Sequence, residues 1–374
     1  MMYSLIMRKV LAVFVCLLSP SVWAADSCAG RCGPGHDSSK TCQCNSFCTT
    51  YGDCCADYYA LCTQQTCSGR CDAPVDSSKP CQCNSACVNY GDCCPDYQTL
   101  CVEGGGNLPD ITCDISCLAN QLWDSDVNKV QVWEYEVNHQ GQTTTSSTSD
   151  EAAKPLFTYV QEATVFQKPT YQTFLALLDN YTPSTSQTES QGSTEWTEID
   201  AFLDAILTTD VMNHLYTFLV QHGHVTDATS YREVLKELWF NLYARSSSGP
   251  INSSGFEHVI VGETSTSKVS GFHNWIQFYL EEKNGAINYQ GWVSRSQALD
   301  IVAARFTWNG LPKAKGSFFV GVSPEFDIAI YTACALTKPN AICSFTMAGN
   351  SLQIQTYDVA HKTGLQVATA YPNI

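Results

Sequence analysis

The chain has few basic residues and lacks a long hydrophobic run. Lys and Arg number 20 against 36 Asp and Glu, so the formal charge at pH 7 is −16. Such a surplus of negative charge argues against binding of a nucleic acid backbone over an extended basic surface. An apolar stretch at residues 10–18 is shorter than the roughly 20 residues of a membrane-spanning helix, and no other stretch approaches that length. We therefore expect no membrane span.

The apolar stretch has the flanks of a secretory signal. Arg8 and Lys9 precede it, and Ser-Pro-Ser-Val-Trp-Ala follows it with residues at the spacing of a cleavage site. We expect cleavage near Ala24, which makes residues 1–24 a signal peptide and the mature protein secreted and extracellular. Twenty of the 21 cysteines lie beyond this segment, an even number that suits an oxidising compartment.

Charge is unevenly distributed over the rest of the chain. Residues 110–250 carry six basic and nineteen acidic side chains, whereas residues 251–315 carry six basic and five acidic ones. The later segment is thus near neutral within an acidic protein. This pattern favours a small local phosphate site and transient contact with flexible single strands over tight binding of a duplex.

Cysteine spacing reveals a tandem repeat in the first third of the chain. Eight cysteines between residues 28 and 62 recur between 67 and 101, each 39 positions later. Eight cysteines in about 35 residues cannot build an ordinary hydrophobic core, so four disulfides per repeat must supply the stability. With two later pairs, the expected disulfide cysteines are Cys28, Cys32, Cys42, Cys44, Cys48, Cys54, Cys55, Cys62, Cys67, Cys71, Cys81, Cys83, Cys87, Cys93, Cys94, Cys101, Cys113, Cys117, Cys334 and Cys343.

Zinc binding is the alternative explanation for Cys-x-Cys and Cys-Cys spacing, but the expected secretion favours disulfides. The eight-cysteine pattern with Tyr-Gly-Asp-Cys-Cys-x-Asp-Tyr resembles somatomedin B domains, at residues 25–63 and 64–102. The resemblance implies small disulfide knots that bind other proteins, and hence an extracellular protein partner. The sequence does not choose among the pairings that eight cysteines permit.

Residues 103–111 contain three consecutive glycines and predict a flexible linker. Beyond it, residues 112–374 first show helical periodicity, over 199–207 and 234–242, and residues up to about 128 also have helical character. Polar low-complexity loops at 142–149 and 183–194 bracket a further helical stretch.

After residue 250 the pattern becomes mainly strand-like. Antiparallel strands and hairpins are predicted at 305–308, 317–322, 326–336, 343–348 and 352–357. A disulfide between the two last cysteines would close a hairpin. We therefore predict an α+β fold, with helices early and antiparallel sheets late.

Two histidines lie in near-identical contexts, His258 in Gly-Phe-Glu-His and His273 in Gly-Phe-His. Period-two alternation predicts a strand over 256–263 that carries the first, and helical spacing predicts a helix from Phe272 to about Lys283 that begins beside the second. Because histidine has an unperturbed pKa near neutrality, such a pair can share acid and base duties. A purely structural role is the alternative for both.

A pair of imidazoles suits phosphodiester transesterification. One removes the proton from a ribose 2′-hydroxyl, the other protonates the 5′-oxygen leaving group, and a cation stabilises the charge gathered on phosphorus. Lys313 and Lys315 are the candidate cations.

Five motifs occur in order: Ser-Gly-Phe-Glu-His-Val with Val-Gly-Glu, Val-Ser-Gly-Phe-His-Asn-Trp-Ile, Trp-Asn-Gly with a following lysine, Gly-Val-Ser-Pro-Glu-Phe-Asp, and Ala-Thr-Ala-Tyr-Pro. Over residues 112–374 they resemble the EndoU family of uridylate-specific endoribonucleases. The resemblance implies cleavage of single-stranded RNA at uridylates, with 2′,3′-cyclic phosphate and 5′-hydroxyl ends. It implies that His273 is the base, His258 the acid and Lys313 the cation, with Lys315 as the alternative amine.

The resemblance assigns further roles. Glu257 and Glu263 match activity-linked carboxylates, Ser317 matches the pyrimidine-recognition position, and Thr369 and Tyr371 match sugar-stacking positions. The animal branch of the family implies dependence on Mn²⁺, with no ligands identified. Judged from the residues alone, the two glutamates suit solvation or the orientation of a histidine equally well.

Other polar residues have competing interpretations. His214, His222 and His224 suggest a metal site, but Gly223 marks a helix end where histidines interact favourably with the helix dipole. Asn180 and Asn252 begin glycosylation sequons, the second close to the predicted active strand.

Two other classes of protein compete with a nuclease. A secreted peptidase lacks a nucleophile motif, since Gly-Val-Ser-Pro-Glu around Ser323 lacks the second glycine of the nucleophile elbow and more simply forms a turn. A non-catalytic adhesion or RNA-binding protein would use the cysteine repeats for binding. Retention of both histidines, the lysine and the terminal tyrosine argues against that class.

Overall fold

The computed structural model describes residues 113–359 and 366–374, together with scattered positions around the cysteines between residues 28 and 101. The chain divides into two units, Met1–Asp110 and Ile111–Ile374. The expected signal peptide and the expected linker at 103–111 lie outside the described residues. Within the described residues, no helix combines the length and apolar character needed to cross a bilayer.

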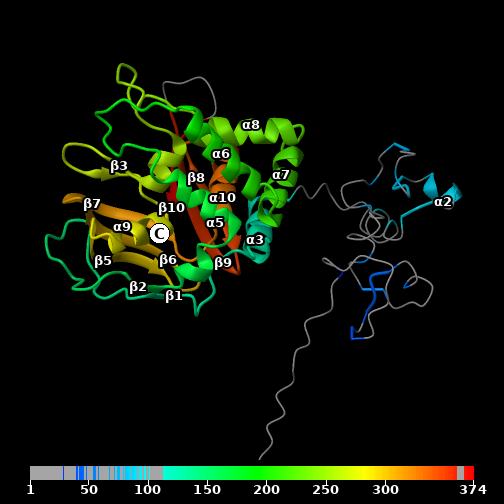
Figure 1. Ribbon diagram of the computed structural model, residues 1–374, viewed down its shortest axis with the longest axis horizontal. Helices are drawn as coiled ribbons and strands as arrows, with labels where there is room; N and C mark the ends of the chain where they lie inside the picture. The colour runs from blue at the N-terminus through cyan, green and yellow to red at the C-terminus, as the bar shows by residue number, and fades with distance from the viewer. Residues whose placement is uncertain are drawn as a thin grey trace, which may run out of the picture. The chain divides into compact units, whose positions relative to one another are not determined.

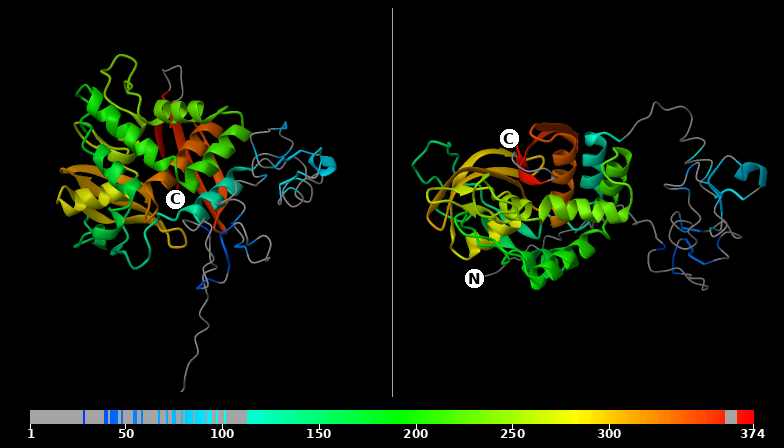
Figure 2. Two further views of the ribbon diagram at one scale, coloured as in Figure 1. Left: turned by 45° about the vertical axis from the view of Figure 1, so that its right-hand side comes forward. Right: turned by 90° about the horizontal axis from the view of Figure 1, so that it is seen from above.

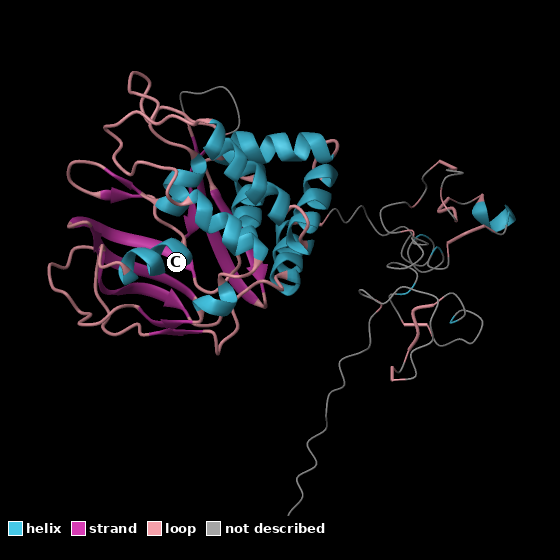
Figure 3. Ribbon diagram, viewed as in Figure 1, coloured by secondary structure: helices cyan, strands magenta, loops and turns pink. Residues whose placement is uncertain are grey.

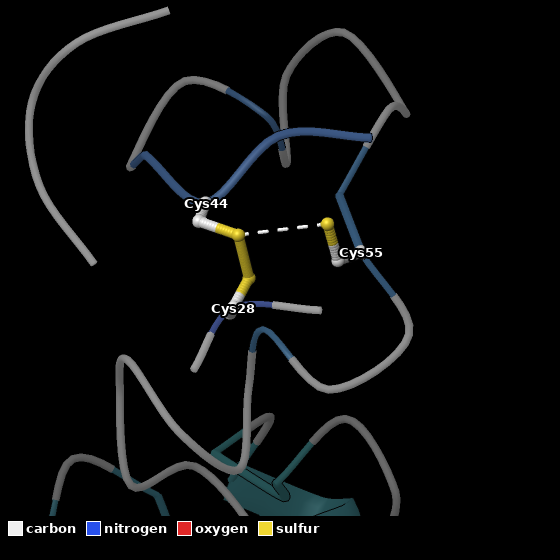
Figure 4. Close-up of side chains that lie close together, drawn as sticks. All are labelled: Cys28, Cys44 and Cys55. Atoms are coloured by element: carbon white, nitrogen blue, oxygen red, sulfur yellow. Dashed lines mark hydrogen bonds between the residues drawn. A yellow bond between two sulfur atoms is a disulfide. The ribbon is translucent and has the colours of Figure 1, made fainter. Parts of the chain in front are cut away.

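Disulfides hold the first unit together, and their pattern repeats. Among its described cysteines, each is bonded to another cysteine, so none offers a thiolate to zinc. Sulfur atoms of neighbouring bridges pack closely, with 3.5 Å between Cys44 Sγ and Cys55 Sγ (Figure 4). Cys32 and Cys62 lie outside the described residues. Cys87 begins the short helix α2 (Cys87–Tyr90). The bridges are Cys28–Cys44, Cys42–Cys55 and Cys48–Cys54, then Cys67–Cys83, Cys71–Cys101, Cys81–Cys94 and Cys87–Cys93.

Most helices gather on one side of the second unit, and the β5–β6–β7 sheet lies on the other with helix α9 packed against it (Figure 3). Side-chain caps begin several helices, as where Asp114 accepts a hydrogen bond from the Cys117 backbone nitrogen. The expected disulfide between Cys113 and Cys117 is present, and it links a residue just before the first helix to a residue in its first turn. The helices are α3 (Ile115–Ser125), α4 (Glu162–Val165), α5 (Pro169–Leu177), α6 (Ser193–Ile206), α7 (Asp210–Gln221), α8 (Ala228–Trp239), α9 (Trp275–Lys283) and α10 (Pro324–Thr337).

Within the part of the chain that the structure describes, the strands form two three-stranded sheets and two small ones, all with antiparallel pairing. The larger sheets have the orders β5–β6–β7 and β10–β9–β8, and the small ones pair β1 with β2 and β3 with β4 (Figure 1). This confirms the predicted α+β class. The strands are β1 (Tyr135–Val137), β2 (Phe157–Val160), β3 (Glu263–Thr264), β4 (Val269–Ser270), β5 (Ile287–Ser296), β6 (Ile301–Trp308), β7 (Leu311–Phe319), β8 (Ile342–Met347), β9 (Asn350–Asp358) and β10 (Val367–Pro372).

The segment predicted as a strand at 326–336 is instead helix α10, and that prediction was wrong. The helix packs between α3, α7 and strand β9 and is buried on nearly every face, so its apolar run carries no period to separate helix from strand (Figure 2). The start signal lies just before it, where the Ser323 side chain accepts from the Phe326 nitrogen and Pro324 occupies the first turn. Cys334 and Cys343 do form a disulfide, but it joins α10 to β8 instead of closing a hairpin.

An aromatic cluster connects the helices to the segment that carries the first histidine. Phe256 is fully buried and packs against Phe174, Phe202 and Phe240, with ring centroids 5.3 to 6.2 Å apart. Burying one such side chain stabilises the fold by about 1.5–3 kcal/mol. The residue two positions before His258 is therefore anchored in the helical layer.

Candidate active site

His258 lies on a short π-helix, η3 (Glu257–Val261), and not on the predicted strand. All five residues are buried, so the hydrophobic run shows no face-to-face alternation by which strand and helix could be separated. The Gly262 nitrogen donates to the Glu257 carbonyl oxygen at 2.7 Å, which closes the wide turn. Such turns occur frequently at functional sites.

The π-helix holds the segment of the second histidine directly. The carbonyl oxygens of His258 and Val259 accept hydrogen bonds from the backbone nitrogens of Phe272 and His273, at 2.9 and 2.6 Å. Gly271, with φ +61°, permits this approach, because a Cβ there would lie 1.7 Å from the His258 carbonyl oxygen. Backbone hydrogen bonds thus keep the two histidines together.

Both imidazoles line one cleft of about 420 Å³. Its walls come from η3, the β3–β4 hairpin and strands β7 and β10, which contact one another (Figure 1). The structure therefore brings together most of the residues that the sequence singled out. The lining residues include His258, His273, Lys268, Lys313, Lys315, Ser317, Thr369 and Tyr371.

Glu263 orients the first imidazole. Its Oε2 lies 2.6 Å from His258 Nδ1 and 3.1 Å from Arg245 Nε, and Ser253 Oγ donates to its other oxygen. Burial raises the pKa of Glu263, but the charges of His258 and Arg245 outweigh burial and bring this pKa to about 2. The carboxylate is therefore ionised at neutral pH. Arg245 and Ser253 were missed in the sequence, because neither belongs to a motif and Arg245 lies 18 positions before Glu263.

The ring of His258 has one nitrogen left for chemistry. Its Nδ1 donates to the ionised Glu263 carboxylate, so Nε2 is the atom available in the cleft. Burial lowers the pKa of His258 to about 4, while Glu263 raises it and the charges of Arg245 and Lys313 lower it. An anion entering the cleft therefore raises this pKa.

The ring of His273 is also held through Nδ1, but by a carbonyl oxygen in place of a carboxylate. Its Nδ1 lies 2.9 Å from the Ser317 carbonyl oxygen, which only accepts, so Nδ1 carries the proton and Nε2 of the neutral ring has a free lone pair. Burial, with the charges of Lys313 and His258, holds the pKa of His273 well below its usual range. The ring also stacks on Tyr371, with centroids 4.8 Å apart and an interplanar angle of 21°.

The two candidate amines occupy different positions. Burial and the charge of Lys268 lower the pKa of Lys313 to about 8, and the charge of Lys313 in turn lowers the pKa of both imidazoles. Lys315 Nζ instead donates to the Ile374 carbonyl oxygen. Lys313 is thus the amine that acts electrostatically on both rings.

Ser317, Thr369 and Tyr371 lie where strands β7 and β10 meet. Ser317 Oγ donates to the Pro372 carbonyl oxygen at 2.5 Å, which joins the two strands and leaves the lone pairs of this hydroxyl for another donor. Thr369 and Tyr371 alternate along β10, opposite Tyr357 and Gln355 of β9. The three residues therefore share one wall of the cleft.

Glu257 differs from Glu263 because it does not line the cleft. It is completely buried, and neither carboxylate oxygen has a hydrogen-bond partner. Burial raises the pKa of Glu257 to about 10, and the charges of Glu263 and Glu189 add to this effect. The side chain is therefore neutral at physiological pH.

The described side chains around the cleft do not form a ligand set for a resident Mn²⁺. A divalent ion of this kind needs several ionised oxygen or imidazole ligands around one point. Among the described residues, the groups of three or more candidate ligands that lie close enough are all disulfide cysteines. With Glu257 neutral and Glu263 bound to His258 and Arg245, the two glutamates do not fit a preformed manganese site. His222 is likewise used elsewhere, at the end of α7 and 3.0 Å from the Cys113 carbonyl oxygen.

The two sequons are placed unfavourably for glycosylation. Asn252 is buried, its Nδ2 donates to the Thr185 carbonyl oxygen, and its Oδ1 accepts from the Arg245 backbone nitrogen. The Nδ2 atom of Asn180 is also shielded from solvent. A glycan on either atom would require the side chain to leave its place.

Comparison with known proteins gives consistent matches. The Endoribonuclease XendoU family model matches residues 114–372, and the Somatomedin B domain model matches residues 26–65 and 65–104. Uridylate-specific endoribonuclease D of Xenopus laevis is 43% identical over 271 residues, which cover 70% of this chain and 88% of that protein. The uridylate-specific endoribonuclease of Homo sapiens is 36% identical over 410 residues, with 98% and 99% covered.

A solved structure agrees with these matches. "The structure of XendoU: a splicing independent snoRNA processing endoribonuclease" aligns with a TM-score of 0.59 and 34% identity, and it covers 71% of this chain and 98% of that one. The similarity therefore extends over the whole of that structure.

Proposed function

The chain belongs to the XendoU family of endoribonucleases and carries two somatomedin B domains, and from this premise we propose that it is a secreted enzyme that cleaves single-stranded RNA after uridylates by attack of the 2′-hydroxyl. The proposed products are a 2′,3′-cyclic phosphate and a 5′-hydroxyl. The observation that carries the proposal is the pair of imidazoles in one cleft whose Nδ1 atoms are bound to unlike partners, a carbonyl oxygen for His273 and a carboxylate for His258.

His273 is the proposed general base. Its neutral tautomer places the free lone pair on Nε2, and its low pKa keeps the ring unprotonated at neutral pH. Nε2 removes the proton from the ribose 2′-hydroxyl, whose oxygen then forms a bond to phosphorus. The Ser317 carbonyl oxygen holds the ring in this tautomer throughout.

His258 is the proposed general acid. As the bond from phosphorus to the 5′-oxygen breaks, Nε2 of the imidazolium donates its proton to that oxygen. The carboxylate of Glu263 stabilises the imidazolium through Nδ1, and the bound phosphate adds a second negative charge that raises the pKa of His258. Both negative charges therefore favour the protonated form of His258 when substrate is present.

Lys313 is the proposed stabiliser of the charge that develops on the phosphate oxygens. Its amine acts on both rings, and the residue is partly buried, so its ammonium interacts more strongly with an anion than it does in water. Proton transfer and charge stabilisation thus come from three side chains of this chain.

Preference for uridine is proposed to come from Ser317. Because its hydroxyl hydrogen is donated to Pro372, the oxygen can accept from the N3–H of uracil, which cytosine lacks. Leaving this acceptor unpaired would disfavour cytosine. Tyr371 and Thr369 border the same wall and are the proposed contacts to the sugar.

Manganese remains a prediction from the family resemblance. Since the described glutamates do not fit a preformed site, no step of the reaction is assigned to a metal ion. Dependence on Mn²⁺ is tested by adding the ion or a chelator to the cleavage reaction. The somatomedin B domains are proposed to bind an extracellular protein.

The test uses a DNA oligonucleotide that contains one ribouridine, with a ribocytidine version for comparison. We expect cleavage of the first with a cyclic phosphate identified by mass spectrometry, and loss of cleavage in His258→Ala and His273→Ala. His214→Ala, on helix α7, is the matched control. Full activity of either site variant with unchanged folding would refute the mechanism, and an inactive wild type that still binds the oligonucleotide would indicate a non-catalytic binding protein.

A further inference from the structure

A third lysine stands at the cleft without an assigned role. Lys268 is an exposed residue at the end of the β3–β4 turn, where the Ser265 nitrogen and hydroxyl both donate to the Lys268 carbonyl oxygen, at 2.9 and 3.2 Å. These bonds close the turn and fix the backbone from which the side chain extends. The residue lines the same cleft as the two imidazoles.

Lys268 and Lys313 line the same cleft near each other, and the charge of Glu263 acts on Lys313 without forming an ion pair with it. Neither amine takes part in the ion pairs of the described residues. The charge of Lys268 lowers the pKa of Lys313, so the two ammonium groups repel each other. On a chain with a formal charge of −16, two unpaired cations facing one cleft favour a ligand with more than one negative charge.

The two lysines differ in depth. Lys313 is partly buried and acts on both imidazoles, which assigns it to the phosphate that reacts. Lys268 is exposed and lines the same cleft, so it is closer to solvent than Lys313.

We propose that Lys268 binds the phosphodiester next to the scissile one, so that the site takes an internal stretch of RNA in preference to a dinucleotide. This inference rests on the proposed nuclease function. The preference for a longer RNA would then arise from two cations at different depths. Lys313 would bind the reacting phosphate, and Lys268 the phosphate next to it. Lys268 is a substrate-binding residue in this scheme and takes no part in proton transfer.

The test compares three substrates that share one scissile linkage: UpA, pUpA with a phosphate on the 5′ side, and UpAp with a phosphate on the 3′ side. We expect wild type to prefer one of the longer substrates by about tenfold in kcat/KM, through KM. Lys268→Ala should abolish that preference and lower kcat/KM for UpA less than for the longer substrates, and Lys268→Arg should keep it. Lys154→Ala, a surface lysine outside this cleft, is the control.

General electrostatic attraction is the competing explanation, and the same series separates it. If Lys268→Ala lowers kcat/KM equally for UpA and for the longer substrates, the flanking-phosphate site does not exist. Binding of a non-cleavable 2′-deoxyuridine trinucleotide, with either phosphate or neutral methylphosphonate linkages, tests the site without catalysis. Equal affinity of wild type and Lys268→Ala for the charged trinucleotide would overturn the inference even if the protein cleaves no RNA.

Discussion

The backbone nitrogen of His273 donates a hydrogen bond to the carbonyl oxygen of Val259, 2.6 Å away. This bond, with its neighbour from Phe272 to His258, fixes the second imidazole against the turn that carries the first. The wide π-turn directs these carbonyl oxygens toward the other segment. Local backbone geometry therefore brings together two histidines that are fifteen positions apart in the sequence.

Gly271→Ala should inactivate the enzyme. The added Cβ would lie 1.7 Å from the His258 carbonyl oxygen, so the two segments must separate and the imidazoles lose their alignment. A misplacement of about 1 Å is expected to lower kcat/KM about 100-fold. Cleavage of the single-ribouridine substrate measures this loss.

Gly285→Ala is the matched control for this substitution. Gly285 also has a positive φ, +78°, but an added Cβ would meet nothing within 4 Å. We expect a stability loss of about 1–2 kcal/mol from the strained conformation, with activity retained. Equal activity losses in both glycine variants would show that general destabilisation, and not the contact with His258, is responsible.

The charges around His258 should shift the pH profile in opposite directions. The acid must be protonated, so kcat/KM falls as pH rises through the pKa of His258, which is about 4 in the free protein. Glu263 raises this pKa and Arg245 lowers it. Glu263→Gln should therefore move the alkaline limb to lower pH, and Arg245→Gln should move it to higher pH.

The opposite directions of the two pH shifts distinguish an electrostatic effect from damage to the fold. Both variants disturb the same buried network, so a purely structural effect would lower activity in both without separating the two limbs. The measurement is kcat/KM on both sides of about pH 4, with thermal unfolding recorded for each variant. If the alkaline limbs of both variants coincide with the limb of wild type, Glu263 is not the carboxylate that sets the charge of His258.

Sequence patterns identified the residues of the site better than the secondary structure that carries them. Ordered motifs identified the residues that meet in the cleft, because such motifs name side chains irrespective of secondary structure. Helical periodicity found α6 and α8, whose apolar residues occupy one face. It failed for η3 and α10, because burial on all sides removes the period that separates a helix from a strand.

Arg245 could not be found from the sequence for a different reason. Its contact with Glu263 joins positions 18 residues apart, and it also donates to the Ala368 carbonyl oxygen on β10. Such contacts depend on the packing of distant segments. The neutral state of Glu257 likewise follows from burial, which a motif does not report.

Glu257→Gln should preserve activity and reduce the pH dependence of stability. The pKa of Glu257 is raised to about 10 in the folded protein, so its contribution to stability is fully present below its ordinary value of 4.5 and is lost as pH rises through about 10. Glutamine resembles the neutral carboxyl and does not ionise. The midpoint of thermal unfolding should therefore fall less between pH 5 and pH 9 in the variant, and a loss of cleavage at pH 7 would show that an ionised Glu257 is needed.

Lys313→Ala and Lys315→Ala should differ sharply. Removing the amine that acts on both imidazoles takes away stabilisation of the charged phosphorane, and we expect kcat to fall about 100- to 1,000-fold with little change in KM. Lys315 Nζ is bound to the Ile374 carbonyl oxygen, so its removal should change kcat only a few-fold. Because Lys313 has a lowered pKa of about 8, activity that needs its charge should also decline above that pH in wild type. Equal losses in the two variants would mean that the site needs positive charge on β7 without regard to its position.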